Sequence, residues 1–228
     1  MFGLDSWVAG FSDGTTLLVV ALVATALGLR HATDPDHLAA VTTLIAGAGD
    51  RATAAAARLG AAWGLGHAAS LFAFGVPIIL FKSYLPTDVQ RAAETSVGIL
   101  IVALACWLLV RWRRGVFDVH AHTHSVRARR PAQAFAIGLV HGTGGSAGVG
   151  VLLLASIHDH VLAVAALGLF ALCTALSMAL LSTGFGRMLA TRPLRTSFAR
   201  LAPALAILSL AFGTWYSLGA LGAAPYFF

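Results

Sequence analysis

A short segment near the N-terminus gathers ionisable side chains between two apolar runs. The stretch Arg30–Leu38 reads Arg-His-Ala-Thr-Asp-Pro-Asp-His-Leu and holds two histidines, two aspartates and an arginine. An Asp or Arg at the centre of a membrane helix costs about 2.5–3.5 kcal/mol, so such a cluster requires pairing or a bound ion. Imidazole with carboxylate suits nickel, cobalt, zinc, copper or iron, whereas an all-oxygen set suits magnesium or calcium. The candidate ligands are therefore His31, Asp34, Asp36 and His37.

A simpler interpretation of this segment is a polar turn at the membrane edge, built around Asp34-Pro35. Against it, residues 38–45 resume an apolar helical pattern. A proline inside a helix removes the hydrogen bond to the carbonyl four residues earlier, here His31, and bends the helix. We therefore expect a helix kinked at Pro35, which turns the two histidines and Asp36 toward one point.

The composition indicates the class of protein that holds this cluster. Of the 228 residues, 58% are hydrophobic and only 11% are charged, whereas soluble domains carry roughly 25% charged residues. The formal net charge of +6 comes from arginines in short groups between apolar runs. That pattern is typical of cytoplasmic loops and argues against a nucleic-acid partner.

Six segments are long and apolar enough to cross a bilayer of about 30 Å. The predicted fold is all-α, a polytopic membrane protein whose bundle forms a single transmembrane domain over residues 1–228. The predicted segments are Thr15–Ala46, Leu59–Phe81, Ala92–Val110, Ala132–Ile157, Val161–Leu181 and Leu201–Leu221.

The loops carry a charge asymmetry that predicts orientation. Six arginines lie in the loop of about residues 111–131, four in residues 187–200 and two at positions 51 and 58. The alternate loops offer only Lys82 and Arg91. We expect the plasma (inner) membrane, with both termini outside and the His/Arg loop 111–131 in the cytoplasm.

A weak internal repeat links the two halves of the chain. Gly28-Leu29-Arg30-His31-Ala32-Thr33 resembles Gly138-Leu139-Val140-His141-Gly142-Thr143, three predicted helices later. Because an odd number of helices separates the two, the halves would have opposite orientations. The pattern predicts a 3+3 inverted repeat, an architecture that places the substrate site where the halves meet.

Two more histidines lie inside predicted helices, His67 and His141. With the orientation above, His37, His67 and His141 each fall about 12–14 Å from the cytoplasmic end of their segments. A single intramembrane histidine is often only a helix–helix hydrogen-bonding residue. A shared depth on three helices favours one site, so we add both to the candidate metal ligands.

These motifs resemble those of the nickel/cobalt transporter (NiCoT) family and its shorter urease-accessory-like relatives. His31-x4-Asp36-His37 resembles the family signature, and Leu65-Gly66-His67 and Gly138–Gly142 resemble its other histidine segments. Members usually have about eight helices, and Pro35 replaces the more usual Ala. The resemblance implies transport of Ni²⁺ or Co²⁺ as substrate, with no prosthetic group. It also implies metallochaperones or metalloenzyme-maturation proteins as partners.

Two other functions compete with transport. An intramembrane serine protease of the rhomboid type would use Ser146 in Gly145-Ser146-Ala147-Gly148, but the segment Leu201–Leu221 lacks the histidine base. A metal-binding accessory subunit would share the site and lack flux. We therefore predict a transporter and no enzyme activity.

The predicted topology can be tested by labelling single cysteines placed in the loop 111–131. We expect an impermeant reagent to label them only after the cytoplasmic side is opened, because lysine and arginine accumulate on that side. Labelling in intact cells would reverse the orientation.

Overall fold

In a computed structural model, the described part of the chain forms six helices. The structure describes residues 17–34, 37–38, 40–41, 52–81, 86–115, 130–144, 151 and 154–225, and no strand occurs among them. The helices are α2 (Leu17–His31), α4 (Ala52–Phe81), α5 (Thr87–Arg113), α6 (Pro131–His141), α8 (His160–Ala190) and α9 (Arg192–Ala220). The predicted all-helical fold with six helices is confirmed.

Four of these helices are long and apolar enough to cross a membrane. The apolar spans are Thr53–Phe81, Thr87–Arg113, His160–Ala190 and Thr196–Ala220. Each begins or ends beyond the predicted segment, because the helical backbone continues into residues that hydropathy excludes, such as Arg111 and Arg113 at the end of α5. Arg113 is exposed, so its charge reaches water while its stem lies along apolar surface. Arg111 is buried, and its guanidinium lies 4.4 Å from the ring centroid of Trp107.

The other two helices, α2 and α6, are shorter than predicted. The continuous helices expected over Thr15–Ala46 and Ala132–Ile157 are wrong, because turns follow His31 and His141. With 15 and 11 residues, α2 and α6 rise about 22 and 16 Å. Neither length crosses a hydrocarbon layer of about 30 Å. The described part of each helix is therefore too short to cross that layer by itself.

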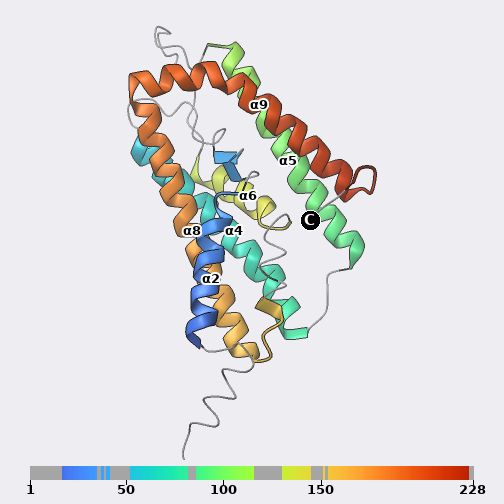
Figure 1. Cartoon of the computed structure of the whole chain (residues 1–228). Helices are drawn as coiled ribbons and strands as arrows, with labels where there is room; N and C mark the ends of the chain where they lie inside the picture. The colour runs from blue at the N-terminus through green and yellow to red at the C-terminus, as the bar shows by residue number, and fades with distance from the viewer. Residues whose placement is uncertain are drawn as a thin grey trace, which may run out of the picture.

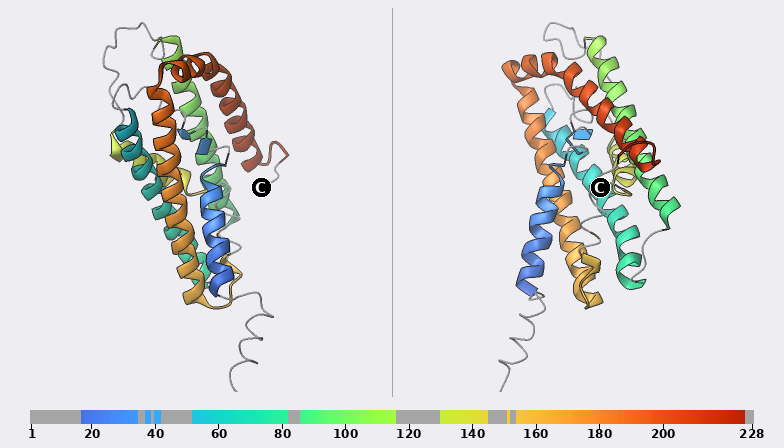
Figure 2. Two further views of the ribbon diagram at one scale, coloured as in Figure 1. Left: turned by 60° about the vertical axis from the view of Figure 1, so that its left-hand side comes forward. Right: turned by 45° about the vertical axis from the view of Figure 1, so that its right-hand side comes forward.

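The helices pack in two groups (Figure 1). α8 contacts both α2 and α4, and α4 contacts α6, so these four helices form one group. α5 and α9 run side by side as a second group, which the rotated views also show (Figure 2). Leu104 of α5 joins Trp63 of α4 and Met178 of α8 in one buried apolar cluster, and this contact links the groups.

Small residues bring α4 close to its two neighbours. Gly60 and Gly64 lie against Ser182 and Ala175 of α8, where an added Cβ would overlap their atoms. On the side facing α6, Gly138 lies against the backbone of Trp63 and His67. Helices in lipid associate through such close packing, because the lipid tails are as apolar as the side chains.

The contacts of α2 with α8 match those of α6 with α4. Gly28 packs on Phe170 and Thr174, and Gly138 packs on Trp63 and His67 at the same spacing along the partner helix. The hydroxyl of Ser177 donates to the carbonyl of Leu29 over 3.1 Å, and that of Ser70 to the carbonyl of Leu139 over 2.6 Å. These are the matched pairs that a 3+3 inverted repeat would give, although the repeat itself stays a prediction.

Glycine substitutions test this packing. We expect Gly28→Val and Gly138→Val to destabilise the protein by about 1–3 kcal/mol each, because the added carbons overlap a neighbouring backbone. Gly184→Val is the matched control, since nothing lies within 4 Å of a Cβ added there. The measurement is thermal unfolding in detergent. Equal unfolding temperatures for the three variants would contradict the close approach.

Candidate metal site

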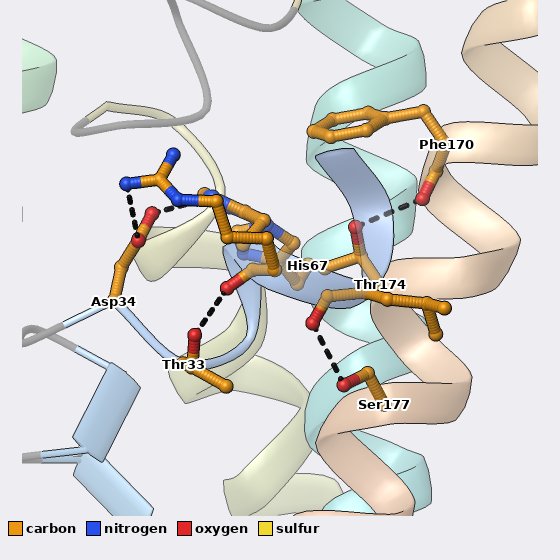
Figure 3. A network of polar contacts seen from close by, with 9 residues as sticks. Thr33, Asp34, His67, Phe170, Thr174 and Ser177 are labelled. Carbon is orange, nitrogen blue, oxygen red and sulfur yellow. Dashed lines mark hydrogen bonds and ion pairs between the residues drawn. The ribbon is translucent and has the colours of Figure 1, made fainter. Parts of the chain in front are cut away.

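The end of α2 is fixed by hydrogen bonds to its last carbonyls. The carbonyl of Arg30 accepts from the backbone N–H of Thr33 over 2.8 Å and from its hydroxyl over 2.6 Å. The carbonyl of His31 accepts from the N–H of Asp34 over 3.1 Å. Figure 3 shows this turn and the bond from Ser177 of α8 to the carbonyl of Leu29. These carbonyls are satisfied without water, as a helix end inside a membrane requires.

The end of α6 repeats this arrangement. The carbonyl of Val140 accepts from the hydroxyl of Thr143 over 2.7 Å, and that of Gly138 accepts from the N–H of Gly142 over 2.9 Å. The hydroxyl of Ser70 on α4 bonds the carbonyl of Leu139. Each short helix therefore ends in a His-x-Thr turn and is held by a serine of a long neighbouring helix.

Three histidines meet between these helix ends. His31, His37 and His67 each offer one ring nitrogen, and these nitrogens lie within 4.8 Å of one another. All three side chains are buried, and His37 and His67 are at most 1% exposed. They come from the last residue of α2, the segment after the turn and the middle of α4. The predicted convergence of the helix 1 histidines with His67 agrees with this geometry.

The spacing of two ligand atoms suits one ion. Nε2 of His31 lies 3.1 Å from Nε2 of His67. This separation is short enough for one ion at about 2.1 Å from both nitrogens.

His141 borders the three-histidine group. Its ring centroid lies 4.5 Å from that of His37 and 6.1 Å from that of His67. The side chain is fully buried, and it belongs to the last residue of α6. As predicted, His141 borders the histidine group.

The two predicted aspartates differ in what the structure describes. Asp34 is buried, and its Oδ2 lies 3.1 Å from Nδ1 of His31. Its Oδ1 lies 3.6 Å from the guanidinium of Arg30, whose side chain is 74% exposed. Asp36 lies outside the described residues, so its place stays a prediction.

The predicted kink at Pro35 is replaced by an earlier break. Pro35 lies outside the described residues, but α2 already ends at His31, four residues before it. The carbonyl expected to be freed by the proline accepts from Asp34 instead. The physical reason is that a residue before proline avoids the helical conformation, so the helix ends ahead of it.

Aromatic side chains on the long helices contact the histidines. The ring of Trp63 on α4 lies 5.5 Å from that of His37 and 5.9 Å from that of His141. Phe170 on α8 lies 5.6 Å from His31 and appears beside the site in Figure 3. Neither Trp63 nor Phe170 was predicted from the sequence. Trp63 precedes His67 by four residues, a spacing that places both on one helix face, whereas Phe170 has no such signal.

The helix ends also shape the electrostatics of the site. His31 and His141 are the last residues of α2 and α6, so two helix C-termini meet at the histidine group. Each C-terminus carries a partial negative charge because the peptide dipoles align along the helix. Broken helices in transporters use such ends to hold cations. The group therefore combines imidazole nitrogens with a field that favours a positive ion.

Comparison with known proteins identifies the family of the chain. A family model described as high-affinity nickel-transport protein, NicO, matches residues 17–199. The chain belongs to this family. The chain is also similar to the urease accessory protein UreH of Bacillus sp. (strain TB-90), at 28% identity over 158 residues, which are 64% of this chain and 67% of that protein. No solved structure is significantly similar.

These matches confirm the resemblance to nickel transporters of the shorter, urease-accessory-like branch. The family is one of transport proteins and not of enzymes, as predicted, and nothing supports an intramembrane protease. Together with the four long apolar helices, family membership makes this a multi-pass membrane protein.

Acid should weaken metal binding to this site. Metal binds neutral imidazole, whose ordinary pKa is about 6.5, so protons compete for the same nitrogens. We expect the affinity of the purified chain for Ni²⁺ to fall as the pH is lowered from about 7 to about 5.5. Titration of Ni²⁺ at several pH values measures this, and an affinity that does not change would exclude the histidines as ligands.

Proposed function

We propose that the chain carries Ni²⁺ across the plasma (inner) membrane and that the ion is bound by the histidine group. The ligands in this proposal are His31, His37 and His67, joined by His141 and Asp36. Cobalt is the second ion that the ligand chemistry suits. The orientation is the one that the loop charges predict, with both termini outside.

The observation that carries the proposal is the buried group of three histidines in a nickel-transport family. Histidines that face one another inside a membrane protein are costly unless they pair or bind something. Imidazole nitrogens are ligands that suit nickel. Membership of the nickel-transport family supports transport as the function of this group.

The proposal includes a destination for the ion. The similar protein from Bacillus is named a urease accessory protein. We expect imported nickel to pass to metallochaperones or maturation proteins in the cytoplasm. A binding subunit without flux remains the second candidate, because it would use the same ligands.

Uptake by vesicles separates the two candidates. The purified chain is placed in liposomes that contain a nickel-sensitive dye, and Ni²⁺ is added outside. We expect rapid uptake by the wild type and background uptake by His37→Ala, which removes a ligand between His31 and His141. Deleting residues 120–124, outside the described part of the chain, should only reduce uptake.

His158→Ala is the matched control, because this exposed histidine follows the turn before α8 and lies outside the group. It should transport as the wild type does. Undiminished uptake by His37→Ala would contradict the proposed site. Wild-type chain that binds Ni²⁺ and gives no uptake would favour the subunit without flux.

A further inference from the structure

Asp34 contacts the histidine group without facing its centre. Its carboxylate reaches Nδ1 of His31, while Nε2 of the same ring faces His67. A carboxylate can only accept a hydrogen bond, so this contact requires the proton on Nδ1. That tautomer leaves the Nε2 lone pair directed into the group.

We propose that Asp34 is a positioning residue, and that it prepares His31 for the metal instead of binding the metal itself. The inference rests on the proposed function of the site. The carboxylate fixes the ring's tautomer and rotation and makes Nε2 a stronger ligand. Carboxylate partners of metal-bound histidines act in this way, and their loss typically lowers metal affinity by about 10–100-fold.

The backbone explains why this contact can form. Asp34 follows the last residue of α2 by three positions, and its N–H bonds the carbonyl of His31. The turn therefore places the carboxylate of Asp34 against the ring of His31, the last residue of α2. Burial of Asp34 excludes water from competing for Nδ1, and this strengthens the contact.

Arg30 gives the carboxylate a second partner of a different kind. The ion pair spans 3.6 Å, and the arginine side chain is mostly exposed. Exposed ion pairs contribute little, about 0–1 kcal/mol. Asp34 should therefore act through His31, and Arg30 should add only a small effect.

Three variants and the wild type test the role of Asp34 by metal affinity. Binding of Co²⁺ to the purified full chain is measured for wild type, Asp34→Asn, Asp34→Ala and Arg30→Gln. We expect Asp34→Ala to bind about 10–100-fold more weakly. Asp34→Asn should fall between it and wild type, because its amide oxygen can still accept from Nδ1. The control Arg30→Gln should remain within about threefold.

A spectroscopic readout separates positioning from direct ligation. The visible absorption of bound Co²⁺ reports coordination number and ligand type. At saturating Co²⁺ we expect Asp34→Ala to give the wild-type spectrum. A changed coordination number would make Asp34 a ligand and overturn the inference.

A double variant tests whether Asp34 acts through His31. In a His31→Ala background, Asp34→Ala should change affinity by less than about twofold, because its target is gone. A full additional loss would show that Asp34 acts elsewhere. If the wild type binds no metal, the proposed function fails. If the wild type binds and Asp34→Ala binds equally well, only this inference fails.

Discussion

Two helix ends buried among the other helices impose a demand that surrounding lipid cannot meet. The last carbonyls of α2 and α6 lack intrahelical donors, and hydrocarbon offers none. The chain supplies the donors itself, from Thr33 and Thr143 in the turns and from Ser177 and Ser70 on the long helices. The partial negative charge that remains at both ends faces the histidine group. The same feature therefore ends the helices and prepares a site for a cation.

The packing of the long helices follows from where the short ones must lie. The short helix of the first half, α2, rests on α8 of the second half, and α6 rests on α4. Glycines at positions 28 and 138 let each pair approach closely enough for a serine to reach a carbonyl. Only when both pairs are formed do His31 and His141 lie near His67, which belongs to α4. The site thus depends on contacts between the halves.

Hydropathy predicted the number of helices because each apolar run must be a helix in lipid. Hydropathy predicted the positions of the helix ends less well. The equal depths used to group the histidines assumed that the helix of His67 begins at Leu59, whereas α4 begins at Ala52 and His67 lies about 22 Å along it. The grouping agrees with the structure for another reason, namely that α2 and α6 end where α4 passes.

The residue types of the motif predicted that its histidines lie together, and the structure changes the expected arrangement of the residues between them. His31, His37, His67 and His141 gather as their chemistry suggested, while Asp34 contacts a ring nitrogen and the proline kink is replaced by a turn. The contacts of Phe170 and Ser177 with α2 could not be predicted. They depend on which helices become neighbours in the fold, and hydropathy does not contain that information.

We propose that His31, His37 and His67, joined by His141, share one nickel ion. X-ray absorption at the nickel edge tests it directly, on chain in which the loop histidines His120, His122 and His124 are replaced by alanine. We predict three or four imidazole nitrogens per nickel at about 2.0–2.1 Å, with the multiple scattering typical of histidine rings. A shell of oxygen atoms without imidazole scattering would contradict the claim.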